Sequence, residues 1–277
     1  MVMLKQQNFV LSFARWQMRE WDPDQYLQFK RERTQPSIEL VARIQMDDPR
    51  TIIDIGCGPG NSTQILLRRW PHADILGLDK SEKMIQKARQ DYPEQKWIVG
   101  DASTLETRQT YDIVFSNAAI HWIPRHEILL QRLFQKVNVN GILAIQIPEN
   151  QESPLYKAIL RVSKSGKWNT FTTGRETAIT YHSAEYYYGQ LSLYTKEITI
   201  WETIYYHIMN SHQELIDWYK STAMKPYLDS LPTDESRTEF EKEIFIECKA
   251  AYPHQRDGKI LYPFKRLFFT ARKLIKE

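Results

Sequence analysis

Hydrophobic residues recur along the chain in two alternating patterns that begin at Thr51. Short apolar runs that end at glycine or polar residues are typical of buried parallel strands. Amphipathic stretches between them, bounded by capping residues and proline, are typical of helices. The predicted strands are 51–55, 74–79, 97–99, 111–115 and 141–147, and the predicted helices are 61–70, 81–91 and 125–137. Strands that alternate with helices predict an α/β fold with a doubly wound parallel sheet.

The pattern changes after Pro148. Two longer apolar runs predict strands at 198–209 and 260–271, which would be added to the same sheet. The stretch 211–250 between them predicts helices, because prolines interrupt an otherwise helical pattern there. These helices are expected to begin at Ser211 and to break at Pro226 and Pro232, and another helix is expected near 155–163.

The composition removes several functional classes. The 277 residues include 37 Lys+Arg and 34 Asp+Glu, a net charge of +3 without a dominant basic run, so no nucleic-acid partner is expected. Cys57 and Cys248 are too few for a disulfide scaffold or a multi-cysteine zinc site, and the histidines show no metal-ligand spacing. No run approaches about 18 apolar residues, and Met1–Glu20 lacks the features of a signal peptide. We therefore expect a cytoplasmic monomer without metal or membrane contact.

A glycine-rich loop follows the first predicted strand. The segment Asp54-Ile-Gly-Cys-Gly-Pro-Gly60 places three glycines at alternate positions, so its backbone can approach a ligand without interference from Cβ atoms. The following helix directs its free N–H groups toward the same point. Asp79 ends the second strand, 19 residues after Gly60, where a carboxylate can accept from the hydroxyls of a ribose. The pattern predicts a nucleoside-binding site.

Two features distinguish among the nucleosides that bind such loops. The dinucleotide fingerprint is G-x-G-x-x-G, whereas the third glycine here comes one residue early and Asn61 stands in its place. Asp54 precedes the loop, where a carboxylate would repel a pyrophosphate but can face a cationic amino acid. Both features favour S-adenosylmethionine over NAD.

Two further polar positions follow predicted strands. Asp101 follows the third strand, where its carboxylate can accept from an adenine amino group. Asn117 follows the fourth strand, at the carboxyl edge where open α/β sheets bind ligands. The segment Asn117-Ala-Ala-Ile120 lacks the Asn/Asp-Pro-Pro-aromatic tetrad of DNA and protein-glutamine methyltransferases, which disfavours transfer to an exocyclic amine.

With these positions in place, the chain resembles the class I S-adenosylmethionine-dependent methyltransferases and, within them, the trans-aconitate 2-methyltransferase family. The N-terminal part of the resemblance is the pattern W-x-P-x-x-Y-L-x-F…E-R, which begins at Trp21 and ends at Arg33. The other resembling segments are 54–63, 117–122, 146–150, 201–207, 216–218 and 266–268. Gln35 and Glu202 depart from the pattern, because the family can have arginine at these positions, and each removes positive charge near the expected anion site.

The resemblance implies methyl transfer from S-adenosylmethionine to a carboxylate of trans-aconitate or a related small polycarboxylic acid, with a monomethyl ester and S-adenosylhomocysteine as products. It also implies a Rossmann-like seven-stranded sheet with a helical cap and an N-terminal lid. The expected parts are an extension and lid at 1–34, a cofactor-binding core at 35–150, and a C-terminal part at 151–277 with cap insertions at about 151–177 and 211–257. The residues expected to bind the cofactor are Tyr26, Arg33, Asp54, Gly56, Gly58, Gly60, Asp79, Lys80, Met84, Asp101, Ala102 and Asn117.

A carboxylate acceptor makes simple chemical demands on the protein. It is already ionised at pH 7, so no general base is required, and the site must align the reactants and exclude water. Arginine suits a carboxylate because its guanidinium donates two parallel hydrogen bonds. The expected substrate-binding residues are Arg175, Tyr181, Tyr205, Tyr206 and Arg266, and the expected positioning residues are His121, Trp122 and Tyr206. Tyr205 and His207 face one side of their strand and Tyr206 the other, and we prefer Tyr206.

Two other functional classes stay open. The first keeps the methyl donor but transfers to a hydroxyl, an amine or a fatty acid; an aromatic content of 12 % suits an apolar acceptor, and His121 would serve as base for a hydroxyl. The second is a nicotinamide-dependent oxidoreductase or a nucleoside-binding module without activity. A pocket of aromatic residues without arginine would favour an apolar acceptor.

Overall fold

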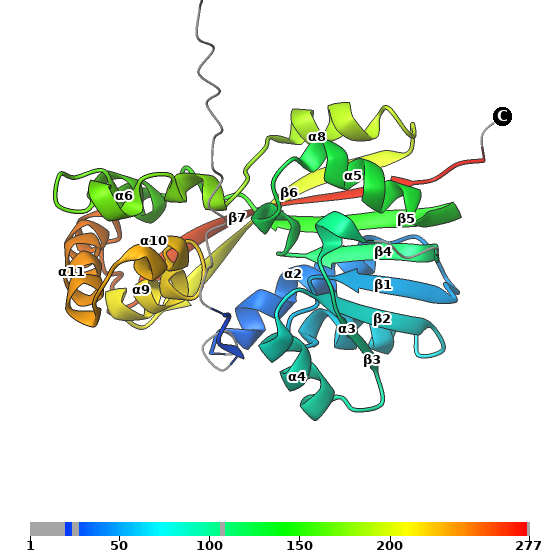
Figure 1. Cartoon of the computed structure of the whole chain (residues 1–277), viewed down its shortest axis with the longest axis horizontal. Helices are drawn as coiled ribbons and strands as arrows, with labels where there is room; N and C mark the ends of the chain where they lie inside the picture. Colours follow the sequence, from blue (N-terminus) through cyan, green and yellow to red (C-terminus); the bar gives the residue numbers. More distant parts are fainter. Residues whose placement is uncertain (1–19, 24–27, 106–108, 276–277) are drawn as a thin grey trace, which may run out of the picture.

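A computed structural model describes residues 20–23, 28–105 and 109–275, and a seven-stranded mixed sheet forms the centre of these ranges (Figure 1). The strand order is β3–β2–β1–β4–β5–β7–β6. The strands are β1 (Thr51–Ile55), β2 (Asp74–Asp79), β3 (Lys96–Val99), β4 (Tyr111–Asn117), β5 (Val137–Pro148), β6 (Ile198–Met209) and β7 (Ile260–Arg272). The first five run parallel, and β7 runs antiparallel to both of its neighbours. The predicted α/β fold is confirmed, and the two long late runs do join the sheet.

Helices cover both faces of the sheet because successive side chains of a buried strand point to opposite faces. Ile52 of β1 packs in one cluster with Leu40 and Leu66, whereas Ile53 packs in another with Leu130. The first face carries α2 (Lys30–Arg43) and α3 (Asn61–Arg69), and the second carries α5 (His126–Gln135) and α8 (Ala184–Leu191). The remaining core helix, α4 (Glu82–Asp91), packs beside β2 and β3. This doubly covered sheet brings the carboxyl ends of five parallel strands to one edge.

A second group of helices, called the cap below, packs at one end of the sheet, at the left of Figure 1. Its members are α6 (Pro154–Ser163), α7 (Asn169–Thr172), α9 (His212–Lys220), α10 (Lys225–Ser230) and α11 (Asp234–Ala251). All of them except α7 contribute to an apolar core that includes the ends of β6 and β7, which continue beyond the last β5 pairing, at Pro148 and Arg266. Three short 3₁₀ turns complete the described structure: η1 (Ala102–Thr104), η2 (Ile120–Trp122) and η3 (Arg175–Ala178).

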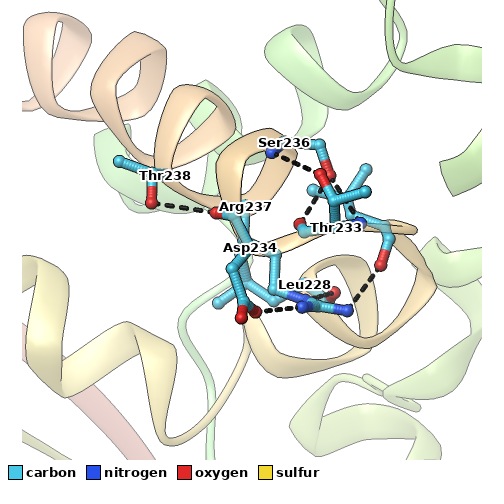
Figure 2. Close-up of polar contacts among 7 residues, drawn as sticks. Leu228, Thr233, Asp234, Ser236, Arg237 and Thr238 are labelled. Atoms are coloured by element: carbon cyan, nitrogen blue, oxygen red, sulfur yellow. Dashed lines mark hydrogen bonds and ion pairs between the residues drawn. The ribbon is translucent and has the colours of Figure 1, made fainter.

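Local sequence signals set the helix ends in this cap. Pro232 lies between α10 and α11 as predicted, whereas Pro226 stands in the first turn of α10 and the break precedes it. Figure 2 shows Thr233 and Ser236 capping each other at the start of α11, one residue after Pro232. The guanidinium of Arg237 pairs with Asp234 and donates to the carbonyl of Leu228 at 3.0 Å, which joins α11 to the end of α10. The junction therefore satisfies backbone groups that two successive helix ends would otherwise leave unpaired.

None of the helices in the described ranges is both long enough and apolar enough to cross a bilayer. The expected N-terminal lid lies largely outside the described residues, which include only Glu20–Pro23 and the chain from residue 28 onward within that part.

Candidate active site

The glycine loop between β1 and α3 has the backbone geometry that requires glycine. Gly56, Gly58 and Gly60 all have positive φ, at 70°, 55° and 94°. A Cβ on Gly56 would lie 2.1 Å from the Cβ of Ala119, whereas a Cβ on Gly58 would meet nothing within 4 Å. Gly56 is therefore required for packing against the chain after β4, and Gly58 presents bare backbone to open space where a ligand can approach.

Two carboxylates hold this loop from either side. Asp79 accepts from the N–H of Gly58 at 2.9 Å and from the N–H of Ser81 at 2.8 Å. Asp54 is fully buried, and its Oδ2 accepts from the hydroxyls of Ser62 at 2.7 Å and Thr63 at 2.6 Å. Burial is the main reason that the pKa of both carboxyls is raised, to about 6 for Asp54. A cationic group next to these carboxyls would therefore stabilise their ionised forms.

Several buried polar atoms around the loop have no hydrogen-bond partner among the described residues. They are Ser37 Oγ, Asp54 Oδ1, Asn61 Nδ2 and Asn117 Oδ1. Ser37, Asn61 and Asn117 line a small cavity together with Arg33 and Gly56. Buried polar groups are normally paired, so this set indicates a ligand with both hydrogen-bond donors and acceptors. An amino-acid group fits, because its ammonium can donate to Asp54 and Asn117 and its carboxylate can accept from Asn61 and Arg33.

The remaining expected cofactor residues lie beyond Asp79. Lys80 forms an ion pair with Asp101, with 2.8 Å between Nζ and Oδ2. Burial opposes ionisation of Asp101, but hydrogen bonds from Lys80 and Ser103 outweigh it and lower its pKa to about 2. Met84 on α4 and Ala102 on η1 are both nearly fully buried. Asp101 is therefore a carboxylate at any physiological pH and can accept from an amino group.

A second, larger cavity adjoins the loop and brings together residues from distant parts of the sequence. Most of its lining is aromatic or apolar. The lining residues are Trp21, Arg33, Ala118, His121, Trp122, Pro148, Asn150, Ile179, Tyr181, Trp218, Tyr219, Thr222, Ala223, Phe264 and Arg266. Arg33 lines both cavities, so they meet at its side chain. The larger cavity is thus formed between the carboxyl edge of the sheet and the cap.

Two buried arginines give this aromatic cavity its charge, since no Asp or Glu is among its described lining residues. Arg266 is 3 % exposed, and its guanidinium lies 4.5 Å from the ring centroid of Phe264. Arg33 is 7 % exposed, donates to Ser221 Oγ at 2.7 Å and lies 4.9 Å above the ring of Trp218. The cavity is suited to an anion with planar carboxylates.

The neighbouring histidines respond to these charges. Burial, followed by the proximity of Arg266, lowers the pKa of His121 to about 3 and that of His207 to about 4. Both imidazoles are therefore neutral at pH 7, and the positive charge in the cavity belongs to the arginines. A histidine with so low a pKa is a poor base for a hydroxyl acceptor.

Three of the expected substrate-binding residues are not part of this cavity lining. Tyr206, the preferred candidate, is 61 % exposed and lies on the opposite face of β6 from Arg266, because it is paired with Pro263 of β7. Tyr205 shares the face of Arg266, 5.9 Å from its guanidinium, but packs toward α2. Arg175 lies on η3, where Asp229 is its neighbour, outside the cavity lining. Tyr26 falls outside the described residues.

The two departures from the family pattern both lie away from the cavity. Gln35 is exposed on α2 and donates to Glu39 at 3.2 Å. Glu202 lies on the same face of β6 as Tyr206 and forms an ion pair with Lys265 at 2.8 Å. Neither Gln35 nor Glu202 replaces a positive charge in the cavity lining, so both departures are compatible with an anionic acceptor.

Several lining residues were not singled out from the sequence. Trp21, Asn150 and Trp218 lie inside the segments that resemble the family, so these segments could have identified them as candidates. Tyr219, Thr222 and Phe264 carry no such signal, because only the packing of α9 and β7 against the sheet edge brings them to the cavity.

Comparisons with known proteins agree with this geometry. A family model described as a methyltransferase domain matches residues 52–141. The chain is 39 % identical over 259 residues to the trans-aconitate 2-methyltransferase of Enterobacter sp. (strain 638), covering 92 % of this chain and 99 % of the relative. It is 36 % identical over 254 residues to the enzyme of that name from Azoarcus sp. (strain BH72), with 92 % and 99 % covered.

Solved structures with low sequence identity share the fold. The YcgJ protein of Bacillus subtilis superposes with a TM-score of 0.56 at 14 % identity, covering 87 % of this chain and 100 % of that one. A Haemonchus contortus phosphoethanolamine N-methyltransferase 2, solved with phosphomonomethylethanolamine and S-adenosylhomocysteine, gives 0.55 at 14 % identity, covering 87 % and 53 %. These neighbours show the fold alone. The two relatives above, each more than one third identical and matched along almost its whole length, place this chain in the trans-aconitate 2-methyltransferase family, to which it belongs.

Proposed function

We propose that this protein transfers a methyl group from S-adenosylmethionine to a carboxylate of trans-aconitate, forming a monomethyl ester and S-adenosylhomocysteine. The observation that carries the proposal is the pair of buried arginines, Arg33 and Arg266, in an aromatic cavity beside the glycine loop. The names of the relatives support this acceptor, since they are trans-aconitate 2-methyltransferases that match the chain along its length.

The residues around the glycine loop fit the methyl donor. Asp54 and Asn117 each have a buried oxygen to accept from an ammonium, and Asn61 has a buried amide nitrogen to donate to a carboxylate. Asp79 lies at the end of β2, where its carboxylate can accept from ribose hydroxyls in addition to the N–H groups that it already binds. Asp101 follows β3, and we assign the adenine amino group to its carboxylate.

The reaction requires the protein to align the two substrates, to pair the charges of the acceptor and to exclude water. When bound, S-adenosylmethionine supplies an electrophilic methyl on a sulfonium; the new O–C bond forms as the C–S bond breaks, and no proton is transferred. Arg33 and Arg266 hold the polycarboxylate, while His121 stays neutral and Trp122 and Trp218 form apolar walls. Positioning of this kind can lower a reaction barrier by roughly 7–11 kcal/mol.

The cavity disfavours the other acceptors. A fatty acid has only one carboxylate to offer to the two buried guanidinium groups, and a hydroxyl acceptor requires a base, which His121 with a pKa of about 3 does not provide. An acceptor that is already anionic uses the arginines and needs no base.

A mass-spectrometric endpoint assay tests the proposal directly. Purified protein with S-adenosylmethionine is incubated with trans-aconitate, cis-aconitate, citrate or no acceptor. We expect one added methyl on trans-aconitate, with less or none on the other acids. Absence of transfer while S-adenosylhomocysteine still binds would contradict the acceptor but not the donor.

The raised pKa of Asp54 predicts how donor affinity varies with pH. In the free protein Asp54 is protonated below about pH 6, whereas a neighbouring ammonium favours its ionised form. Donor affinity should therefore be constant above about pH 6 and fall by up to about tenfold per pH unit below it, because binding must release a proton.

Isothermal titration of S-adenosylhomocysteine between pH 5 and 8 measures this dependence. Asp54→Asn should bind weakly and without the step near pH 6. A wild-type affinity that does not change between pH 5 and 8 would show that Asp54 does not face the ammonium.

A further inference from the structure

The turn η2 carries two of the cavity residues, His121 and Trp122, and a buried histidine lies behind it. Nε2 of His126, the first residue of α5, is 2.9 Å from the carbonyl oxygen of Ile120. Nδ1 of the same ring is 2.6 Å from the hydroxyl of Tyr187 on α8. Neither His126 nor Tyr187 has any measurable exposure. Neither of them lines the cavity.

The two contacts fix the protonation of the His126 ring. A carbonyl oxygen only accepts, so Nε2 must carry the proton and donate to Ile120. In a neutral imidazole the other nitrogen is then an acceptor, so the Tyr187 hydroxyl donates to Nδ1. Burial lowers the pKa of His126, which favours this neutral form.

The anchor extends from the turn to the sheet. The ring of Tyr187 stacks on Phe269 of β7, with 4.8 Å between the ring centroids. The next carbonyl of the turn, that of His121, accepts from the N–H of Thr180 at 2.8 Å. Two successive carbonyls of η2 are thus held from outside the turn, by elements that are far apart in the sequence.

The backbone around η2 needs such support. Ala118 and Arg125, which flank the turn, have positive φ of 52° and 58° although neither is glycine. A non-glycine residue in this region is strained and persists only where surrounding contacts determine its conformation. The His126 contact is one of those contacts.

We propose that His126, oriented by Tyr187, is a positioning residue that fixes η2 and thereby sets His121 and Trp122 against the methyl acceptor. The inference rests on the proposed function for its acceptor, and it assigns His126 and Tyr187 no contact with substrate. Their role is to hold the cavity wall at the distance that the reaction requires.

Kinetics of three variants test the role. His126→Leu removes both contacts, Tyr187→Phe removes one and keeps the stacked ring, and His126→Gln retains an N–H donor and an oxygen acceptor. We expect kcat/KM for trans-aconitate to fall roughly ten- to a hundredfold in His126→Leu, since a displacement of about 1 Å has effects of this size. The value of kcat/KM should fall less in Tyr187→Phe and should be close to the wild-type value in His126→Gln. Kd for S-adenosylhomocysteine should stay within about twofold of the wild-type value in all three variants.

His212 provides a matched control for stability. Its ring is also buried, and its Nε2 lies 2.8 Å from the carbonyl of Tyr252, within the cap and outside the cavity lining. His212→Leu should lower Tm by an amount similar to His126→Leu but leave kcat and KM for the acceptor unchanged. If His126→Leu lowers Tm alone, or weakens donor and acceptor binding equally, the positioning role is refuted.

A second measurement does not depend on the acceptor. In protein labelled with 5-fluorotryptophan, the Trp122 resonance is identified by its loss in Trp122→Phe. We expect it to shift or split in His126→Leu and Tyr187→Phe and to stay as in the wild type in His126→Gln and His212→Leu. An unchanged Trp122 resonance in His126→Leu overturns the inference, whereas failure of the proposed function appears separately, as no methyl transfer by the wild type.

Discussion

Replacing Arg266 with glutamine is expected to lower kcat/KM for trans-aconitate by about a hundredfold or more, while Kd for S-adenosylhomocysteine stays within about twofold. Removing one partner of a buried, hydrogen-bonded charge pair typically costs about 2–5 kcal/mol, and each 1.4 kcal/mol is a factor of ten. Arg266 is almost completely buried and lines the larger cavity only, so the loss should fall on the acceptor.

Arg33→Gln should have a different signature, because Arg33 lines both cavities. We expect this variant to weaken the binding of both the acceptor and the donor. Steady-state kinetics with each substrate varied, combined with titration of S-adenosylhomocysteine, separates the two arginines. Equal effects of both variants on donor affinity would contradict the arrangement of the two cavities.

Two other variants serve as matched controls for this pair. Arg175→Gln removes an arginine that lies outside the cavity lining, and Tyr206→Phe removes a hydroxyl from the exposed face of β6. Both should leave kcat/KM within about twofold of the wild type. A loss in Arg175→Gln equal to that in Arg266→Gln would place the acceptor nearer to η3 than the cavity lining indicates.

Asp79→Asn is expected to weaken S-adenosylmethionine binding by about a hundredfold. The carboxylate accepts from two backbone N–H groups at once, and an asparagine would turn its own NH₂ toward one of those donors. Each hydrogen bond to a charged group contributes about 1.5–3 kcal/mol, so losing a ribose contact and disturbing Gly58 together give an effect of this size.

Asp74→Asn is the control for that variant, since Asp74 stands at the opposite end of β2 and is paired with Lys96 on the surface at 2.7 Å. Titration should find its donor affinity equal to that of the wild type, with Tm measured for both variants. If Asp79→Asn binds the donor normally, the nucleoside does not lie at the end of β2.

Several residues of the small cavity beside the glycine loop could be predicted from the sequence because they are local, although Ser37 was not predicted. Asp54, the three glycines and Asn61 lie within eight consecutive residues, and strand-end positions such as Asp79 follow from the alternation of strands and helices. In a parallel sheet all of these strand ends meet at one edge, so the proximity of these residues follows once the strands are identified.

The acceptor side required the tertiary structure. Tyr206 and Arg266 lie on adjacent strands, and both were reasonable candidates, but the pairing of β6 with β7 places Thr203 and not Tyr206 opposite Arg266. A shift of one residue in an antiparallel register moves a side chain to the other face, and with tyrosines on both faces the local sequence does not show which of them shares the face of Arg266. The anchor of η2 is similar, since His126 and Tyr187 are 61 residues apart in the chain.

The sequence by itself therefore determined the strands, most of the helices, the glycine loop and the class of chemistry, because each depends on neighbouring residues or on a short motif. Helices α2, α7 and α8 were not predicted. The tertiary structure alone decided which arginines are buried together, which residues of β6 share the face of Arg266, and how Arg33 comes to border both cavities. These depend on strand register and on the packing of the cap against the sheet edge, where contacts join residues that are distant in the chain.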